Sequence, residues 1–364
     1  MNPSLLQLQH ILKRHKIDAL LISQPENRRF LSGFSATDHS INESSGYLLI
    51  PKQGTPFLLT DARYHLQAHR DVSGFDIVIY TRGFLLLLKS LLHKLRVKTL
   101  AFEANYLLYN KYLSLTKVSQ TLALTLIPFD GHVERLRLSK SAQELAAIKR
   151  SVALNETCFQ QIFPTIKPGQ TEIDIALSLE NAMRQLGAER PSFDTIVASG
   201  PNGALPHAVP SHRRILKNEP VIIDMGLILD GYCSDMTRTI VLGTPDNDTI
   251  QRFRLVRQAQ LAGLAALRPG VTGREVDSAA RSIIRRAGYG PHFGHSLGHG
   301  VGLAVHENPS LSHRNRSQLK SGMVVTVEPG IYLPEWGGIR LENMAVITEH
   351  GHELLNKDTT FLDL

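Results

Sequence analysis

The chain has 364 residues and carries 40 Lys and Arg against 33 Asp and Glu, so its formal net charge is +7. Its apolar fraction of 42% and charged fraction of 20% are ordinary for folded proteins and exclude wholesale disorder. The leucine-rich run at 84–88 falls far short of the ~20 residues that span a bilayer. The first basic residues follow the apolar ones, unlike a signal peptide, and 2 cysteines make no disulfide framework. We therefore expect a cytoplasmic, non-membrane protein of two domains.

The excess positive charge lies in the first third of the chain. Residues 1–130 carry 15 Lys and Arg against 9 Asp and Glu, whereas residues 131–364 carry 25 against 24. A nucleic-acid face would group basic side chains on one element and interleave them with aromatic residues that stack on bases. Here the basic residues are scattered among leucines, so we interpret them as a solvated surface and expect no nucleic-acid partner.

Residues 1–130 alternate between helical and strand-like patterns. Amphipathic spacing indicates helices, and short apolar runs between turn residues indicate strands. The predicted helices cover 4–16, 84–95 and 106–117, and the predicted strands cover 19–22, 46–50, 56–59, 75–80, 99–102 and 122–129. This alternation is typical of a layered α/β domain.

The segment 131–140 is polar and charged, and we place a linker between the two domains there. A second domain then covers 141–364. It opens with a long helical pattern over 141–163, in which Ser141 and Glu144 have the spacing of a capping box.

One sequence pattern occurs twice in the second domain. Pro-Gly-x-Thr stands at 168–171 and again at 269–272, each time between two helical patterns. Each Thr is suited to cap the start of a helix, and Gly187 and Gly288 are suited to end it. The matched spacing indicates an internal duplication, and hence a domain with pseudo-two-fold symmetry.

Acidic residues interrupt apolar strand patterns in the second half of the chain. In the segment 220–242, two apolar runs flank Asp230-Gly231, which is typical of a tight hairpin turn. With these two residues as the turn, Asp224 and Asp235 become diagonal neighbours on one face of the hairpin. Two buried carboxylates on one face cost several kcal/mol unless a cation or protons compensate.

Three more residues complete a candidate metal site. Glu328 follows one apolar strand pattern, Glu342 precedes another, and His299 lies among glycines that allow close backbone approach. Four carboxylates and one imidazole form a ligand set suited to Mn²⁺, Co²⁺, Fe²⁺ or Zn²⁺. Two such ions ~3.5–4 Å apart would activate a water molecule and polarise a carbonyl group. The sequence therefore predicts a centre with two divalent metal ions.

These motifs resemble those of the pita-bread metallopeptidases, a family that includes aminopeptidase P, prolidase, methionine aminopeptidase and creatinase. The resemblance rests on DMG and SDMTRT around Asp224 and Asp235, GHGVG around His299, VEPGIY at Glu328 and GIRLEN at Glu342. It covers residues from about 141 to the end of the sequence. The first domain is more weakly similar to the creatinase-type N-terminal domain.

The resemblance implies a fold class and a division of the metal ligands. The expected fold is α+β: a pita-bread catalytic domain with pseudo-two-fold symmetry, preceded by a smaller creatinase-like α/β domain. Asp224 is implied to hold one ion and His299 with Glu328 the other, while Asp235 and Glu342 bridge the two. Mn²⁺ is the expected metal, with Co²⁺, Zn²⁺ and Fe²⁺ as alternatives.

The resemblance also implies catalytic roles. His207 and His306, with His295 as a weaker match, lie at substrate-side positions where imidazoles donate to an oxyanion and carry protons. Glu328 is implied to act as general base in addition to binding metal. Arg340 stands two residues before the last carboxylate in a strand, on the same face, and is expected to hold the carboxylate cluster.

We predict from these features an Xaa-Pro aminopeptidase, which hydrolyses the bond between an N-terminal residue and a following proline. An Xaa-Pro dipeptidase (prolidase) is the alternative; it would need a positive group for the substrate carboxylate, and the sequence assigns none. A non-catalytic peptide-binding module on the same fold is a third hypothesis, against which the intact ligand set argues. The resemblance further implies a homodimer.

Two features bear on the substrate. The segment 35–45 is longer than the glycine turn common in relatives, where the first domain of a partner subunit often reaches toward the active site. We therefore expect this segment to influence the accepted peptide length. Tyr332 and Trp336 are hypothesised to line a pocket for the proline ring.

Overall fold

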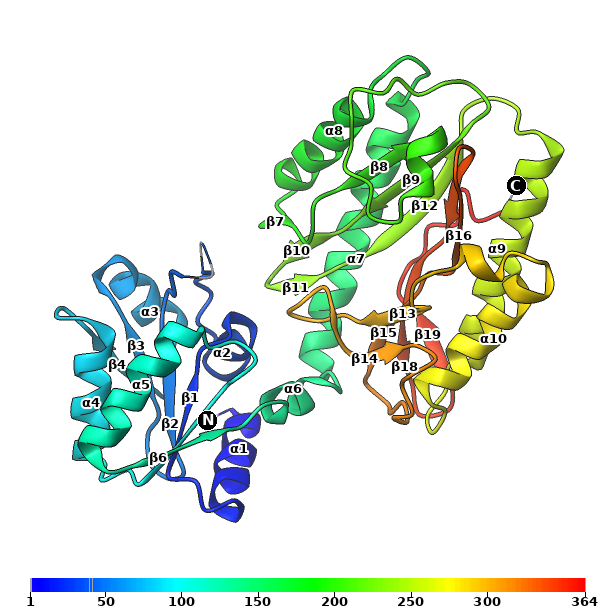
Figure 1. The fold of residues 1–364 in the computed structure, drawn as a ribbon. Coiled ribbons are helices and arrows are strands. Elements are labelled where there is room, and N and C mark those ends of the chain that lie inside the picture. Colours follow the sequence, from blue (N-terminus) through cyan, green and yellow to red (C-terminus); the bar gives the residue numbers. More distant parts are fainter. Residues whose placement is uncertain (1, 39, 41, 364) are drawn as a thin grey trace. The chain divides into compact units, whose positions relative to one another are not determined.

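The computed structural model describes residues 2–38, 40 and 42–363. The chain forms two compact units, Met1–Arg137 and Leu138–Leu364, each with its own hydrophobic core (Figure 1). Among the residues described, no helix combines the length and the apolar character that crossing a membrane requires.

The first unit is built on a six-stranded mixed sheet with strand order β4-β3-β2-β1-β5-β6. Its strands are β1 (Ala19–Ile22), β2 (Tyr47–Pro51), β3 (Phe57–Thr60), β4 (Asp76–Ile79), β5 (Thr99–Phe102) and β6 (Thr125–Pro128). The central strand β1 pairs antiparallel with β2 and parallel with β5. Each strand lies within a few residues of a predicted apolar run.

Helices cover both faces of this sheet. They are α1 (Pro3–Arg14), α2 (Pro25–Ser32), α3 (His65–Asp71), α4 (Phe84–Lys94), α5 (Tyr109–Leu122) and α6 (His132–Arg137). Because side chains alternate along a strand, Leu20 and Ile22 pack in one core with α1 and α2, whereas Ala19 and Leu21 pack in another with α4 and α5. The unit is therefore a three-layer α/β domain, as predicted.

Three helices of the first unit differ from the sequence-based expectations. Helices α2 and α3 were not predicted because their 8 and 7 residues are too few to show a clear helical period. The segment 131–140 was predicted as a linker, but residues 132–137 form α6. Val133 of α6 is buried in the core, and Nη1 of Arg137 donates to Oδ1 of Asn27 at 2.8 Å. The polar composition of this segment therefore did not reveal that it contains a buried apolar residue and a hydrogen bond to α2.

The second unit contains four long helices and several small sheets. The helices are α7 (Ala142–Ile162), α8 (Glu172–Gln185), α9 (Asn247–Ala266) and α10 (Gly273–Arg286). One sheet has the order β12-β9-β8, formed by β8 (Ile196–Ser199), β9 (Pro220–Met225) and β12 (Met236–Val241). A second has the order β14-β13-β15-β18-β19, formed by β13 (Gly298–Gly300), β14 (Glu307–Leu311), β15 (Val324–Val327), β18 (Asn343–Ile347) and β19 (His352–Leu354).

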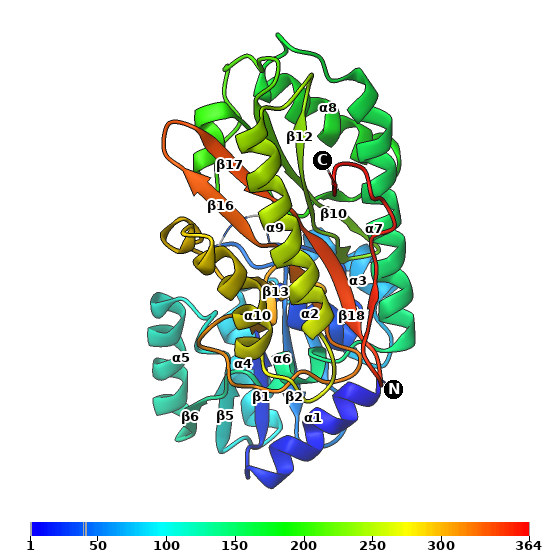
Figure 2. The ribbon, with the colours of Figure 1, turned by 90° about the vertical axis from the view of Figure 1, so that its right-hand side faces the viewer.

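Smaller strand pairs complete this unit. Strands β7 (Arg190–Pro191), β10 (Leu227–Leu229) and β11 (Tyr232–Cys233) form one sheet, and β16 (Gly330–Leu333) pairs with β17 (Gly337–Arg340). Helices α7 and α8 pack with β8, β9 and β12 around Phe159 and Leu179, while α9 and α10 pack with β15 and β18 around Phe253 and Val276 (Figures 1 and 2). Each half thus has two helices on one sheet.

The two halves repeat the same local structure. Thr171 caps α8 and Thr272 caps α10, each within a capping box. Each threonine also forms an isolated β-bridge, with Arg214 and Gln318 respectively. These matched contacts agree with the duplication that the two Pro-Gly-x-Thr segments indicate and with the pseudo-two-fold symmetry of the expected fold.

A buried arginine holds the long segment 35–45 of the first unit, of which residues 39 and 41 lie outside the description. Arg28 of α2 has 0% relative exposure. Its Nη1 donates to the carbonyl oxygen of Gly46 at 2.6 Å, and its Nη2 donates to the carbonyl oxygen of Ala36 at 3.0 Å and to Oδ1 of Asp38 at 2.9 Å. Arg28 therefore fastens the segment to the domain at several points, while Asp71 and Gln67 hold its first residue, Ser35.

We predict that Arg28→Met lowers the free energy of unfolding by about 3–5 kcal/mol, because it removes the charged partner of a nearly buried carboxylate and one hydrogen-bond donor from each of two carbonyl groups. Urea unfolding followed by circular dichroism measures this loss. Arg63→Met is the control, since Arg63 pairs with Asp61 at the surface and its removal should leave stability almost unchanged. Equal stability of the two variants would contradict the assigned role of Arg28.

Candidate functional site

A single cavity of about 530 Å³ in the second unit brings all the predicted site residues together. Its walls include four carboxylates, four histidines and one arginine, namely Asp224, Asp235, Glu328, Glu342, His207, His295, His299, His306 and Arg340. Additional walls come from apolar residues described below. The convergence of residues far apart in the sequence makes this cavity the candidate active site.

The first two carboxylates lie on the hairpin that the sequence predicts. Leu229 pairs with Tyr232 around a turn at which Asp230 and Gly231 have φ of 53° and 83°. The same register continues into the pair of β9 and β12, where Asp224 lies opposite Thr237. Asp235, two residues before Thr237, is therefore the diagonal neighbour of Asp224.

The other ligand candidates come from the second large sheet. Glu328 directly follows β15 and Glu342 directly precedes β18, and these two strands are paired antiparallel. His299 lies in the middle of β13, which pairs with β15 on its other side. A Cβ atom at Gly298 would overlap the carbonyl oxygen of Thr326, so glycine is required there for β13 to approach β15.

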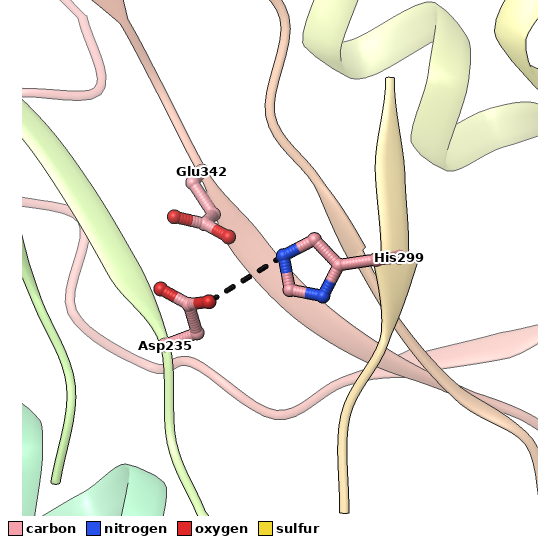
Figure 3. A group of neighbouring side chains, drawn as sticks. All are labelled: Asp235, His299 and Glu342. Atoms are coloured by element: carbon pink, nitrogen blue, oxygen red, sulfur yellow. Dashed lines mark ion pairs between the residues drawn. The ribbon is translucent and has the colours of Figure 1, made fainter. Parts of the chain in front are cut away.

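Three of these side chains form a compact group (Figure 3). Ligand atoms of Asp235, His299 and Glu342 all lie within 4.8 Å of one another. Nε2 of His299 is 3.6 Å from Oδ2 of Asp235 and 3.2 Å from Oε1 of Glu328. Asp224 lies outside this group and faces Arg340, whose Nη2 donates to its Oδ2 at 2.7 Å.

Two buried carboxylate oxygens of the site lack a partner. Oδ1 of Asp224 and Oε1 of Glu342 are buried and accept no hydrogen bond within the described part of the chain. An unsatisfied buried carboxylate oxygen is costly, and a cation beside it would compensate that cost. Hard oxygen donors beside one imidazole are the donor set that divalent ions such as Mn²⁺ and Zn²⁺ accept. The residues present therefore fit metal ions.

Two carboxyl groups of the site, those of Glu342 and Asp235, favour their protonated forms. Burial raises the pKa of Glu342 to about 8, with repulsion from Glu328 and Asp224 adding to it. Burial and the same kind of repulsion also raise the pKa of Asp235 well above its ordinary value. Both shifts mean that the cluster does not tolerate four negative charges without compensating positive charge.

The histidine of the site, His299, favours its charged form. Burial alone would lower the pKa of His299, but the hydrogen bond and charge of Glu328 outweigh it and raise the pKa to about 9. Burial alone would raise the pKa of Glu328, but the hydrogen bond and charge of His299 lower it to about 2. The two residues therefore form an ion pair in which a proton occupies the place between imidazole and carboxylate.

Threonines that the sequence analysis missed hold the carboxylates in place. Oγ of Thr237 donates to Oε2 of Glu342 at 2.8 Å, and the backbone N–H of Glu342 donates to the carbonyl oxygen of Thr237 at 3.1 Å. Oγ of Thr326 donates to Oε1 of Glu328 at 3.1 Å and accepts from the backbone N–H of His299 at 3.0 Å. Strand parity was the available signal, because each threonine is two residues from a carboxylate and shares its face.

Arg340 connects the carboxylate cluster to two parts of the cavity wall. Besides Asp224, its guanidinium donates to Oη of Tyr332 at 2.9 Å and to the carbonyl oxygen of Pro206 at 3.1 Å. Pro206 directly precedes His207, so Arg340, which holds the carboxylate of Asp224, also fixes the backbone next to His207. The cavity placement agrees with the expectation that Arg340 holds the cluster.

The three substrate-side histidines have different surroundings. His306 is exposed and lies beside His299, with 4.4 Å between the ring centroids. Although part of the side chain is exposed, desolvation of its half-buried ring, with the neighbouring charge of His299, lowers the pKa of His306, so it is neutral near pH 7. A neutral imidazole retains one N–H that can donate to substrate.

His295 has no such donor left. Its Nδ1 is 2.8 Å from the carbonyl oxygen of Ser296, which only accepts, so we assign the proton to Nδ1. Its Nε2, 2.9 Å from Oη of Tyr332, then accepts from that hydroxyl. Burial lowers the pKa of His295, consistent with this neutral form. The ring is therefore a fixed part of the wall and not an oxyanion donor in this geometry.

Of the two aromatic residues hypothesised to line a proline pocket, only Tyr332 lines the cavity. Tyr332 lines the cavity together with Phe193, Ile196, Val209 and Pro210. Trp336 is not part of this lining; it packs against the core near α9, with the guanidinium of Arg252 4.4 Å from its ring centroid. Its spacing from Tyr332 along the hairpin of β16 and β17 was not enough to direct its ring to the cavity.

We predict that Asp235→Asn makes the metal-free protein more stable but abolishes its response to Mn²⁺. Asn cannot ionise, so it removes the cost of burying one of four neighbouring acids and should raise the free energy of unfolding in EDTA by roughly 1–2 kcal/mol. Wild-type protein should gain ~2.7 kcal/mol when free Mn²⁺ is at 100 times its dissociation constant, and the variant should gain none.

Thermal unfolding of both proteins, with and without the ion, measures these changes. Asp230→Asn is the matched control, because Asp230 pairs with Arg150 at the surface and lies outside the cavity. Loss of stability in EDTA by Asp235→Asn, or an undiminished response to Mn²⁺, would count against a metal centre here.

Comparison with known proteins supports the interpretation of this cavity. Residues 146–349 match the metallopeptidase family M24, and residues 5–139 match the creatinase/prolidase N-terminal domain. A protein named Xaa-Pro dipeptidase from Pyrococcus horikoshii is 34% identical over 359 residues, covering 98% of this chain and 97% of that protein.

Solved structures agree with these matches over nearly the whole chain. The Xaa-Pro dipeptidase from Bacillus anthracis has a TM-score of 0.91 at 37% identity, covering 98% of this chain and 97% of its own. The X-Pro aminopeptidase from Thermotoga maritima has a TM-score of 0.86 at 37% identity, covering 95% of this chain and 97% of its own. Both the expected fold and the expected two-domain composition are therefore confirmed.

Proposed function

Because this chain belongs to the metallopeptidase family M24 and carries a creatinase/prolidase N-terminal domain, we propose that it is an Xaa-Pro dipeptidase. The observation that carries the proposal is the convergence of four carboxylates and His299 in one cavity. Sequence analysis favoured an aminopeptidase over a dipeptidase. The relatives support the dipeptidase better, since proteins with that name match the chain in both sequence and structure.

The proposed chemistry is hydrolysis of the peptide bond on the amino side of proline. Asp224, Asp235, His299, Glu328 and Glu342 would hold two divalent ions. Bound there, such ions activate a water molecule and polarise the scissile carbonyl group. Glu328 accepts a proton from the attacking water and returns it to the proline nitrogen as the carbon–nitrogen bond breaks.

The exposed histidines act on the substrate oxygen. His306 is neutral and retains an N–H, and His207 lines the same cavity, so both donate to the oxyanion as it forms. His295 has both ring nitrogens occupied by Ser296 and Tyr332, and we assign it to the wall that orients the substrate.

An apolar wall suits a proline ring. Phe193, Ile196, Val209 and Pro210 line the cavity, and Val209 is strongly exposed. The amide nitrogen of a prolyl bond has no N–H to recognise, so binding must depend on shape and apolar contact. These residues supply both.

One observation favours the aminopeptidase as a second candidate. A dipeptide substrate places the proline carboxylate inside the cavity, where a cation should receive it. Among the described residues that line the cavity, Arg340 is the only arginine or lysine, and its guanidinium already binds Asp224. A longer peptide has no charge at that position and needs no such partner.

Hydrolysis of Gly-Pro and Gly-Pro-Leu separates the two candidates. The protein is stripped of metal, reloaded with Mn²⁺, Co²⁺ or Zn²⁺ one at a time, and assayed on both peptides. We expect a higher kcat/KM for Gly-Pro. A higher value for Gly-Pro-Leu would replace the dipeptidase with the aminopeptidase, and no hydrolysis of either peptide with any ion would refute both.

Three finer features complete the proposal. Mn²⁺ is the proposed ion, with Co²⁺, Zn²⁺ and Fe²⁺ as alternatives, because the donors are mostly carboxylates. A cytoplasmic location is proposed because Cys158 and Cys233 are both buried and do not form a disulfide with each other. A homodimer is proposed from the family resemblance. Elemental analysis and light scattering test the ion and the assembly.

We predict that His306→Ala lowers kcat about 10²–10³-fold, as expected for the loss of one oxyanion donor. The affinity for Mn²⁺ should be unchanged, because His306 is not in the proposed ligand set. Steady-state kinetics and calorimetric titration measure the two effects. His313→Ala serves as control, since His313 is exposed and does not line the cavity; equal kcat values for the two variants would remove His306 from the mechanism.

A further inference from the structure

An ion pair on α10 lies outside the cavity wall but contacts the segment that carries part of it. Asp277 is 1% exposed, and Arg281 stands one helical turn later. Nε and Nη2 of Arg281 donate to the two carboxylate oxygens of Asp277, each at 2.7 Å. This is a bidentate, charge-assisted contact, the strongest kind that two side chains make.

The pair forms hydrogen bonds with the backbone of every second residue of the segment 293–297. Arg281 donates through Nη1 to the carbonyl oxygen of Phe293 at 2.8 Å and through Nη2 to that of His295 at 2.6 Å. Asp277 accepts from the backbone N–H of Leu297 at 3.2 Å. The guanidinium also lies 4.1 Å from the centroid of the Phe293 ring. Four contacts therefore fix a segment with no regular secondary structure of its own.

Three residues of the candidate active site depend on this segment. His295 belongs to it, and His299 follows two residues after it in β13. The carbonyl oxygen of Leu297 accepts the backbone N–H of Glu328 at 2.8 Å, so the segment also positions this carboxylate. The ion pair is thus hydrogen-bonded directly to the backbone of one wall residue, His295, and is connected through Leu297 to two proposed metal ligands, His299 and Glu328.

The other copy of the duplication lacks this pair. Thr171 and Thr272 are equivalent N-caps, so the positions of Asp277 and Arg281 correspond to Ala176 and Glu180 in α8. Helix α8 nevertheless packs on its sheet through the same kind of buried apolar face. The ion pair is therefore not required to build the helix, and it occurs in the half whose following loop carries His295 and His299.

We propose that Asp277 and Arg281 are positioning residues that hold the 293–297 segment so that His295, His299 and Glu328 meet at the metal centre. The proposal rests on the function proposed above for that centre. Residues that orient metal ligands typically change metal affinity or activity 10–100-fold when they are replaced. We expect changes of that size, although neither side chain touches metal or substrate.

Four variants test this role. Arg281→Gln removes the charge and both carbonyl contacts. Arg281→Lys retains the charge but cannot form the bidentate contact with Asp277. Asp277→Asn retains an acceptor for Leu297 with nearly the same shape. Arg150→Gln is the matched control, because Arg150 also forms an Arg–Asp pair, with Asp230 at 2.7 Å, but at the surface of α7 and away from the cavity.

Mn²⁺ affinity of the folded, metal-stripped protein is the first readout, measured by calorimetric titration well below the unfolding temperature. Arg281→Gln should raise the dissociation constant for Mn²⁺ about 10–100-fold, Arg281→Lys less, and Arg150→Gln not at all. A purely structural role would lower the thermal midpoint of the metal-free protein without changing this constant. Should Arg281→Gln fail to fold, Arg281→Lys and Asp277→Asn carry the same test.

Hydrolysis of Gly-Pro by the same proteins is the second readout. We expect kcat to fall more than KM rises, since the ligands and general base are displaced while the apolar wall is intact. Unchanged Mn²⁺ affinity and unchanged kcat in all folded variants would overturn the positioning role. A wild-type protein that binds Mn²⁺ but cleaves neither peptide would refute the proposed function alone, because the affinity changes would still test the positioning.

Discussion

Burial of four carboxylates around one imidazole is the constraint on which the second unit depends. Each of these acids would be ionised in water at neutral pH, and bringing them together in a cavity of low dielectric is strongly unfavourable without positive charge. Arg340 neutralises one of them and a proton on His299 offsets another. The remaining charge explains why burial and mutual repulsion raise the pKa of both Asp235 and Glu342. Divalent ions resolve this imbalance more completely than protons do.

Such a cluster requires a rigid frame, because the acids repel one another in the absence of metal. The frame consists of paired strands whose ends carry the acids, and three of the four acids, Asp224, Glu328 and Glu342, accept from a nearby guanidinium or hydroxyl. Glu342 shows the arrangement: Thr237 contacts both its backbone and its carboxylate, and Arg238 donates to its carbonyl oxygen at 2.8 Å. Only Oε1 remains free of hydrogen bonds in the described chain, and this atom is available to an ion.

Local patterns predicted most of the elements and the residues that meet in the cavity, but not the contacts that hold them. The hairpin register placed Asp224 and Asp235 correctly, because a two-residue turn fixes the pairing of every residue that follows. The short helices α2 and α3, and the helix α6 within the expected linker, gave too little periodicity to be recognised. The role of the Asp277–Arg281 pair could not be predicted for another reason. In the sequence it resembles any exposed i, i+4 ion pair on a helix, and only the tertiary structure shows the backbone groups that it contacts.

The duplicated frame holds its two histidine-bearing loops by different chemistry. In the first half, Glu172 at the start of α8 accepts from the backbone N–H groups of Ser199 and Ser211 and from the amide of Asn202, and so brackets the loop that carries His207. In the second half, the loop before His299 presents the carbonyl groups of Phe293 and His295 toward α10, and a carboxylate cannot bind them. Arg281 reaches those carbonyls, and Asp277 pairs with it while accepting from the N–H of Leu297. The two copies of the scaffold thus hold their loops with different side chains. A carboxylate alone can hold backbone N–H groups, whereas carbonyl groups need a donor such as an arginine.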